Sequence, residues 1–414
     1  MTLNLDRFPR YTAFDPLLPV WCITPGEGRV IHRFFDTSPV SPSGRYVALT
    51  RLPYEDRPPG PGDAAEVVLV DLESGDERVV AETRGWDMQL GAQAQWGADD
   101  RTLLFNDVDT ETWQAFAVKL DCESGVAARL SGPVYMVSPD GRMLASPCLA
   151  KTGITQAGYG VIVPPERQPT NRGAPADDGI TVTDVETGAS RLLVSIAEIV
   201  ETAEPAFDAD AYTDGGFYGF HVKWNPRGDR LMFVLRFKSD SGGPLRHHVV
   251  TLRADGTEIR QAVPTALWSR GGHHPNWCPD GDTILMNLRL DGETMRFVRI
   301  PAEGGEVEVL AERLFGSGHP SMHPDGRHIV TDVYLGRPLA FGDGTIPLRW
   351  IDVPEQVDRT LVRIRTQPEF IGPHGMLRVD PHPAWDRSHR TITFNACPDG
   401  TRRVFIADLD EVIE

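Results

Sequence analysis

Short apolar stretches alternate with polar turns along most of the chain, and one turn pattern returns seven times. Each copy joins an extended run to a Pro-Asp-Gly-like turn and then to an apolar stretch, as in Val134–Gly141 (VYMVSPDG) and His319–Gly326 (HPSMHPDG). The seven copies begin at Thr37, Gln93, Val134, His221, His274, His319 and His382. Apolar stretches this short, bounded by glycine- and proline-containing turns, predict β-strands rather than helices.

Each repeat predicts four antiparallel strands. An apolar strand such as Tyr46–Thr50 follows the turn, a second strand such as Val67–Asp71 ends at a Ser-Gly hairpin, and a short strand such as Arg78–Val80 comes last. Seven units of this kind predict an all-β fold, a single seven-bladed β-propeller. Because one blade cannot bury its faces alone, we expect residues 1–414 to form one domain.

The last repeat is too short for a complete blade. It stops after Arg403–Leu409, which leaves no room for a fourth strand. Two N-terminal segments, Val20–Ile23 and Arg29–Arg33, could supply that strand. We therefore expect the N-terminal segment to close the ring by pairing with the last blade, which removes an exposed sheet edge.

The long segments between predicted strands all belong to one kind of connection. They follow the second strand of a blade or lead into the next blade, whereas the other turns are tight. These segments are residues 53–66, 150–179, 201–220, 336–347 and 366–381. Because connections of that kind lie on one face of a propeller, and long loops in compact folds are usually functional, this face is expected to carry the site.

Four consecutive repeats begin with histidine. The first strands of the blades line the central channel, so His221, His274, His319 and His382 should point toward a common axis, with Gln93 facing them from across the ring. Converging imidazoles suit Mn²⁺, Zn²⁺, Fe²⁺ or Ni²⁺ better than Ca²⁺ or Mg²⁺. The alternative is that each histidine only hydrogen-bonds the neighbouring blade.

Other side chains near this mouth could take part in chemistry. His273 stands beside a repeat histidine and could act as a base, and Tyr159 lies in a glycine-containing stretch that could bend over the mouth and donate a proton. Arg378 could hold a substrate carboxylate, or could simply pair with Asp380. His247 and His248 fall in a predicted third strand away from the channel and are expected to have no role.

Composition narrows the function classes. The formal net charge of −18 argues against a nucleic-acid-binding surface, although it allows a small anionic substrate. No apolar run is long enough to predict a membrane span, and the N-terminus does not resemble a secretory signal. The five cysteines show no paired metal spacing, which favours reduced thiols in a cytoplasmic protein.

The chain carries repeats of the form His-Pro-x-(Trp/Met)-x-Pro-Asp-Gly and a C-terminal segment from His382-Pro-Ala-Trp to Asp408-Leu. In these two features it resembles the oligogalacturonate lyase family of seven-bladed propellers. The resemblance implies a cytoplasmic enzyme that holds a manganese-type cation and cleaves uronic-acid oligosaccharides by β-elimination. It implies that His274, His319 and His382 are metal ligands, that His221 is a fourth ligand or the base, and that Arg378 neutralises the substrate carboxylate. The chain departs from the family at Leu377–Pro381, where the family has a glutamine and a second histidine.

Three functions follow as alternatives. The first is a metal-dependent lyase, with Mn²⁺ as the expected cofactor and a small anionic oligosaccharide as the expected partner. The second is a non-catalytic, TolB-like propeller that binds a protein or sugar through the face that carries the long loops. The third is another carbohydrate enzyme, a hydrolase or epimerase, that uses the same pocket. Metal content separates the second from the others, and an unsaturated product separates the first from the third.

Overall fold

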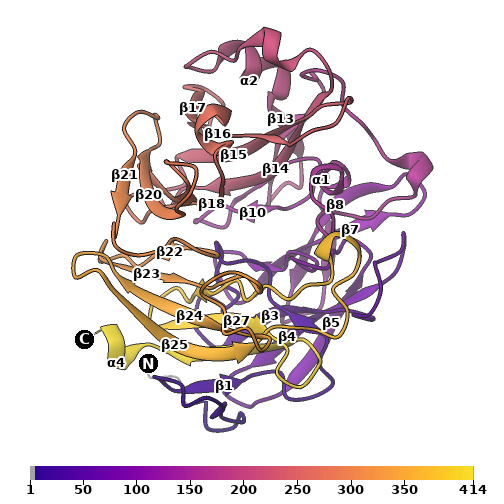
Figure 1. Cartoon of the computed structure of the whole chain (residues 1–414). Coiled ribbons are helices and arrows are strands. Elements are labelled where there is room, and N and C mark those ends of the chain that lie inside the picture. Colours follow the sequence, from indigo (N-terminus) through magenta and orange to yellow (C-terminus); the bar gives the residue numbers. More distant parts are fainter. Residues whose placement is uncertain (1–4, 414) are drawn as a thin grey trace.

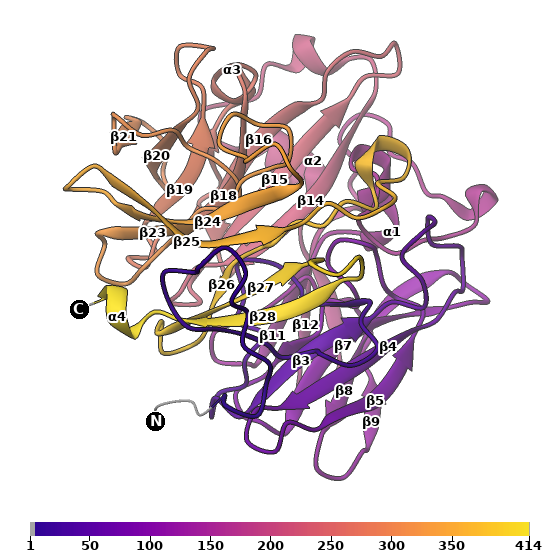
Figure 2. The same cartoon turned by 60° about the horizontal axis from the view of Figure 1, so that its bottom comes forward.

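The computed structural model describes residues 5–413 and confirms the seven-bladed β-propeller with four antiparallel strands in each blade. The blades follow one another around a ring (Figures 1 and 2). In blades 1 to 6 the strands run outward in chain order, so each hairpin forms from neighbouring segments of the sequence.

The first three blades share an innermost strand of two residues and differ in the lengths of their outer strands. Blade 1 contains β2 (Val30–Ile31), β3 (Tyr46–Arg51), β4 (Ala65–Asp71) and β5 (Glu77–Thr83). Blade 2 contains β6 (Gln95–Trp96), β7 (Thr102–Asp109), β8 (Gln114–Asp121) and β9 (Ala127–Arg129). Blade 3 contains β10 (Met136–Val137), β11 (Met143–Ser146), β12 (Gly179–Asp184) and β13 (Ser190–Ser195).

The histidine-bearing repeats form the remaining blades. Blade 4 contains β14 (Gly216–Trp224), β15 (Arg230–Lys238), β16 (Arg246–Arg253) and β17 (Arg260–Val263). Blade 5 contains β18 (Gly272–Trp277), β19 (Thr283–Leu288), β20 (Arg296–Pro301) and β21 (Glu308–Leu310). Blade 6 contains β22 (Ser321–Met322), β23 (His328–Thr331), β24 (Thr345–Asp352) and β25 (Val357–Arg365). Blade 7 contains β26 (Ala384–Trp385), β27 (Thr391–Ala396), β28 (Arg403–Asp408) and β1 (Val20–Cys22).

The N-terminal segment closes the ring as predicted. Strand β1 pairs antiparallel with β28, with Val20 opposite Ala407 and Cys22 opposite Phe405. In Figure 1 the indigo start of the chain and the yellow end meet in this blade. The second candidate segment, Arg29–Arg33, instead supplies β2, the innermost strand of blade 1. Pairing the two ends of the chain in one sheet leaves that sheet with no missing strand.

The helices lie in the long connections or at the end of the chain. They are α1 (Leu149–Thr155), α2 (Ile196–Thr202), α3 (Thr265–Trp268), α4 (Asp410–Ile413) and three short 3₁₀ turns at Pro165–Arg167, Ala209–Tyr212 and Pro373–Gly375. Two long connections meet over the ring (Figures 1 and 2), where Gly158 packs against Met376. This contact brings the segment after α1 next to the segment before β26, and so builds one wall of the site.

The repeated turn and the blade tryptophans explain why the blades stack. Gly141 has a φ of 74°, which favours glycine, and a Cβ atom there would lie 2.4 Å from the backbone nitrogen of Ala98 in blade 2. Trp96 and Trp277 are buried, and their indole N–H groups donate to the carbonyls of Pro39 and Lys223 in the preceding blades. These tryptophans therefore join adjacent blades, as core packing predicts.

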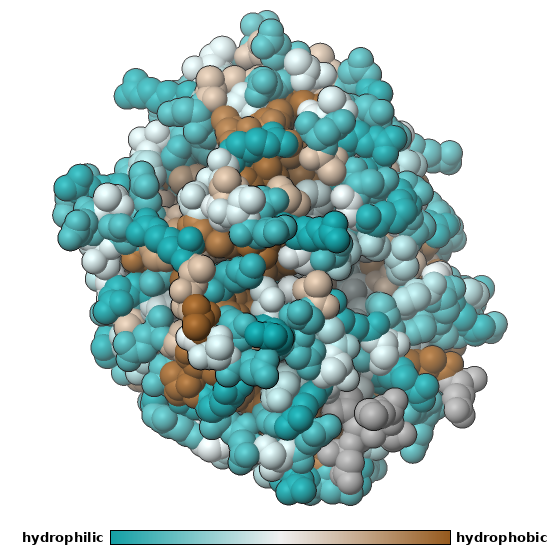
Figure 3. Space-filling view, turned by 180° about the vertical axis from the view of Figure 1, so that it is seen from behind, coloured by the Kyte–Doolittle hydropathy of each residue, from teal (hydrophilic) through white to brown (hydrophobic). Residues whose placement is uncertain are grey.

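The face of the molecule seen in Figure 3 is mainly hydrophilic. In Figure 3, hydrophobic side chains form small separate groups among charged and polar ones. Within residues 5–413, no helix is both long enough and apolar enough to cross a membrane.

Candidate metal centre and adjoining cavity

The four repeat histidines converge at one mouth of the channel. The ring centroids of His274 and His319 lie 3.9 Å apart, and those of His319 and His382 lie 4.4 Å apart. The ring of Phe34 contacts all four imidazoles, including that of His221 at 5.3 Å. Residues from four blades thus surround one aromatic side chain from the segment that follows β2.

Three of the side chains at this mouth form a compact set of possible metal ligands. His319, Asp380 and His382 are all buried, and one ligand atom from each lies within 4.8 Å of the others. Two imidazoles and one carboxylate suit first-row transition metals. From the sequence, Asp380 is predicted only to pair with Arg378. Its position two residues before His382 is the feature that could have identified it as a possible ligand.

His382 shows that the site fits a cation. Both of its ring nitrogens are buried and without a hydrogen-bond partner among the described residues. Burial also holds the pKa of His382 well below its usual range, so the imidazole is neutral at pH 7. A buried neutral imidazole with unused nitrogens is costly unless something binds it, and a neutral imidazole is the form that ligates metals.

Asp332 fixes the orientation of His319. Its two carboxylate oxygens lie 2.9 and 3.0 Å from Nδ1 of His319, and it also accepts from the backbone N–H groups of His319 at 2.7 Å and His382 at 3.3 Å. Burial alone would raise the pKa of Asp332, but its contacts with His319 hold it below the ordinary value. The anionic carboxylate therefore accepts the hydrogen bond from Nδ1–H of His319, which leaves the Nε2 lone pair, 3.4 Å from the Tyr334 hydroxyl, as the atom that faces a cation. Sequence reasoning missed Asp332, which follows β23 without any repeat signal.

His274 and Gln93, the other predicted ligands, lie differently. Nδ1 of His274 is 2.8 Å from the Gly318 carbonyl, to which it donates, and its Nε2 is 3.2 Å from the Tyr334 hydroxyl. Gln93 is buried, and its Oε1 has no hydrogen-bond partner among residues 5–413. Neither belongs to the three-residue set, so their roles as ligands stay predictions.

A cavity of about 240 Å³ adjoins this set of ligands. Its lining includes the predicted residues His221, His273, Tyr159 and Arg378, together with His274 and Tyr334, which contact His319. His247 also lines the cavity, stacked on Trp268, so the expectation that it lies away from the site is wrong. Strand β15 of blade 4 adds Val234 and Arg236 to this lining, and the neighbouring β16 adds His247.

Arg236 is the most unusual charge in the cavity, and the sequence analysis did not single it out. Its guanidinium lies 3.5 Å above the Phe220 ring and donates to the Thr155 carbonyl and to Oε1 of Gln156, both at 3.2 Å. No carboxylate of the described residues forms an ion pair with it, and its Nε has no partner. Burial lowers the pKa of Arg236 to about 9. Its position within the otherwise apolar run Leu231–Phe237 is the sequence feature that could have identified Arg236 as a candidate functional residue.

Arg378 contrasts with Arg236 because it is paired. Its Nε donates to Asp380 at 2.8 Å, and its Nη2 donates to the Tyr159 hydroxyl at 3.2 Å. Burial tends to lower the pKa of Arg378, but the charge of Asp380 raises it above the ordinary value. Arg378 therefore joins the cavity to the possible metal ligand Asp380, and its contact with a substrate carboxylate stays a prediction.

His221 and His273 differ in how free their nitrogens are. Nε2 of His221 is buried and has no partner, whereas Nδ1 of His273 accepts from Asn287 at 3.2 Å and lies 3.0 Å from Nδ1 of His274. Burial lowers the pKa of His273 to about 3 and holds that of His221 well below its usual range. Both are neutral near pH 7, and Nε2 of His221 is the nitrogen without a hydrogen-bond partner.

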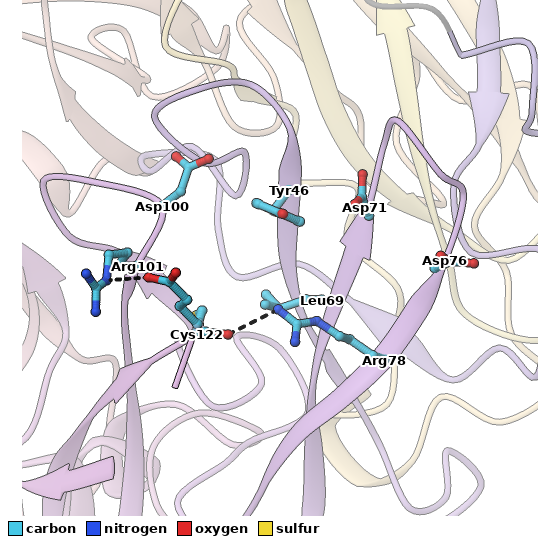
Figure 4. Close-up of a pocket in the computed structure, with 9 residues that line it drawn as sticks. Tyr46, Leu69, Asp71, Asp76, Arg78, Asp100, Arg101 and Cys122 are labelled. Atoms are coloured by element: carbon cyan, nitrogen blue, oxygen red, sulfur yellow. Dashed lines mark hydrogen bonds and ion pairs between the residues drawn. The ribbon is translucent and has the colours of Figure 1, made fainter. Parts of the chain in front are cut away.

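A separate hollow between blades 1 and 2 holds none of these residues (Figure 4). It is lined by Tyr46, Leu69, Asp71, Asp76, Arg78, Asp100, Arg101, Cys122 and Glu123. Its arginines are engaged: Arg101 pairs with Asp121 at 2.7 Å, and Arg78 donates to the Cys122 carbonyl at 3.4 Å. The channel mouth, not this hollow, combines unpaired donors with an enclosed space.

Comparison with known proteins supports the fold and leaves the activity open. No protein-family model matches the sequence. A segment of 87 residues is 29% identical to the uncharacterized peptidase YuxL of Bacillus subtilis (strain 168), which covers 21% of this chain and 13% of that protein. The chain thus matches only a small part of that curated relative.

Two solved lyase structures share the architecture over nearly their whole length. The oligogalacturonate lyase of Vibrio parahaemolyticus has a TM-score of 0.67 at 16% identity, with 100% of this chain and 99% of that chain covered. An oligogalacturonate lyase in complex with manganese has a TM-score of 0.65 at 15% identity, with 98% and 97% covered. The β-propeller domain of the Trilobed protease from Pyrococcus furiosus is more distant, with a TM-score of 0.51 at 11% identity, covering 91% of this chain and 95% of that chain. The chain therefore has the seven-bladed propeller fold of oligogalacturonate lyases, as the sequence resemblance predicts.

Proposed function

We propose that this protein is a metal-dependent lyase that cleaves uronate-containing oligosaccharides by β-elimination. The observation that carries the proposal is the unpaired guanidinium of Arg236, buried in a cavity that also holds the free nitrogen of His221 and adjoins the His319, Asp380 and His382 set. The overall likeness to oligogalacturonate lyases supports it.

Arg236 selects an anionic substrate. A buried cation without a counter-charge is destabilising, and a carboxylate entering the cavity supplies that charge. A guanidinium offers paired N–H donors that match the two oxygens of a carboxylate, and a uronate is a sugar with this group next to C5. Local charge in the cavity outweighs the net charge of −18 at this short range.

His319, Asp380 and His382 would hold the cation. When bound, it stabilises the negative charge that develops on the carboxylate as the C5 proton leaves. Mn²⁺ is the first cation to test, because the imidazole and carboxylate donors suit it and one structural neighbour is a manganese complex.

His221 is the base, and Tyr159 is the acid. Nε2 of His221 accepts the C5 proton, the C4=C5 double bond forms as the C4–O bond breaks, and the leaving oxygen takes a proton. Burial raises the pKa of Tyr159 to about 12, which keeps its hydroxyl protonated at neutral pH. Its oxygen already accepts from Arg378, so its own proton is available to donate.

The cellular setting follows from the same chemistry. Five free cysteines support a cytoplasmic setting for the proposed reaction. A cavity of about 240 Å³ accepts part of a short oligosaccharide rather than a folded partner, and we expect no nucleic-acid or membrane partner.

The test is an assay of untagged protein on uronate oligosaccharides, with and without Mn²⁺, that follows the ultraviolet absorbance of the unsaturated product. Wild type loaded with Mn²⁺ should form product, chelator-treated protein should not, and R236M, D380N and H221A should each lose activity. R101M, at the rim of the hollow in Figure 4, is the matched control and should match wild type. New reducing ends without absorbance would indicate a hydrolase, and tight sugar binding without any product would indicate a binding propeller.

A further inference from the structure

A second cluster of metal-ligating side chains lies in blade 6, at the turn between β22 and β23. This turn has the sequence His323-Pro-Asp-Gly-Arg-His328. It belongs to the tight turns after the first strands, on the face opposite the long loops and the cavity. One ligand atom from each of His323, Asp325 and His328 lies within 4.8 Å of the others.

Both histidines face the same carboxylate oxygen. Oδ2 of Asp325 lies 2.6 Å from Nδ1 of His328, which donates to it, and 3.0 Å from Nδ1 of His323. The backbone N–H of Asp325 donates to Nδ1 of His323 at 3.3 Å, so this nitrogen presents a lone pair. A lone pair and a carboxylate oxygen therefore face each other at 3.0 Å, and a cation between them would turn a repulsion into two bonds.

The other blades show that this turn does not need histidine. In blade 3 the hydroxyl of Ser138 donates to Asp140, and in blade 5 the hydroxyl of Thr283 donates to Asp280. These two positions correspond to His323 and His328, and blade 6 is the one of the seven sequence copies with imidazoles at both. A serine or threonine hydroxyl at either position is therefore enough to form the turn. The two imidazoles of blade 6 are not needed for the turn itself and are therefore available for another role.

Oδ1 of Asp325 accepts from the backbone N–H groups of Arg327 and His328, so Oδ2 is the oxygen that faces the imidazoles. Arg327, the neighbouring cation in the turn, donates to Asp352 at 2.6 Å rather than to Asp325. A third imidazole, that of His389 in blade 7, has its ring centroid 5.9 Å from that of His323. Two imidazoles and a carboxylate, with a further imidazole or water to complete the set, match the ligands and tetrahedral geometry of Zn²⁺.

We propose that His323, Asp325 and His328 bind a divalent transition metal, with Zn²⁺ preferred, independently of the channel mouth. The site lies beside blade 7, the blade that closes the ring, because His323 also contacts Trp385 with ring centroids 5.3 Å apart. Metal binding there ties blade 6 to the closing blade and stabilises the propeller against heat.

The test separates the two sites by substitution. The parent is untagged H319A/H382A protein, in which the channel-mouth set is disabled, and the matched variant adds H323S and H328T, the residues found at these positions in blades 3 and 5. After dialysis against Zn²⁺, elemental analysis should give about one equivalent in the parent and none in the matched variant. Zn²⁺ should raise Tm only in the parent, and Co²⁺ should quench the emission of Trp350, whose ring stacks on His328 at 4.6 Å.

Zinc content that is unchanged by H323S/H328T, or absent from the parent, would overturn this proposal. The H323S/H328T substitutions in otherwise wild-type protein should leave the cavity chemistry unaffected, so the proposed lyase activity and this site are tested separately.

Discussion

Replacing Asp332 by asparagine should weaken metal binding at the channel mouth while leaving the propeller folded. Asn has nearly the same volume, and its oxygen can still accept the His319 backbone N–H that Asp332 binds at 2.7 Å. Its NH₂ group, however, replaces the oxygen that faces the His382 N–H at 3.3 Å and removes the charge that holds the Nδ1 proton of His319. His319 then exchanges between tautomers, and the one protonated on Nε2 cannot ligate.

The expected magnitude follows from the position of Asp332 behind the ligand. Changes to a group that orients a ligating histidine cost about 10- to 100-fold in metal affinity, which equals about 1.4 to 2.7 kcal/mol. The loss of charge-assisted hydrogen bonds within a buried site should also lower the free energy of unfolding by about 1.5 to 3 kcal/mol. Both effects arise because Asp332 and His319 are almost fully buried, at 1% and 0% exposure.

The assay is calorimetric titration of metal-free protein with Mn²⁺, together with urea unfolding. The matched control is D343N, which changes an exposed aspartate in the same connection between β23 and β24, where it pairs with Arg363. The control should bind metal as wild type does. Folded D332N with wild-type affinity for Mn²⁺ would refute the argument that the carboxylate sets the tautomer of His319.

Three further predictions test charge and closure. R236M should not lower the urea midpoint, because it removes an unpaired buried cation, yet it should reduce kcat/KM on a uronate substrate about thirtyfold or more; a fall in stability without a fall in activity would contradict this. Burial lowers the pKa of His32 to about 4 and that of His273 to about 3, whereas a histidine of the unfolded chain has a pKa of about 6.5. As the pH falls through about 6.5, the unfolded chain binds protons at these two histidines and the native state does not. Metal-free protein should therefore lose about 2 kcal/mol per histidine between pH 7 and pH 5 in urea titrations, and equal midpoints at the two values would exclude it. V20D places a charge in buried strand β1 and should cost about 3 to 5 kcal/mol, against about 0.5 kcal/mol or less for V79D on an exposed position; equal thermal shifts would show that β1 does not close the ring.

The repeats were predictable because they depend on local chemistry. Short apolar strands and glycine turns need only the neighbouring residues to form hairpins, so the number of blades, the four strands in each and closure by an N-terminal segment all follow from the sequence pattern. The convergence of the four histidines follows from the repeat as well, because equivalent positions in a closed ring face one axis. The one uncertainty in the closure was which N-terminal segment pairs, and only the register with β28 decided it.

The site depends instead on contacts between distant segments. Asp332 follows a strand, Asp380 lies in a long loop, and Arg236 sits within an apolar strand, and none of these positions carries a repeat signal. Whether Arg236 is paired, or whether Asp380 faces His319 rather than solvent, is set by how the loops of different blades pack. The sequence alone therefore determined the propeller and the ring of histidines. The tertiary structure decided that Asp332 and Asp380 are the carboxylates beside these histidines and that Arg236 is the cation without a carboxylate partner. The reason is that the partners of a buried charge are fixed only when the ring has closed.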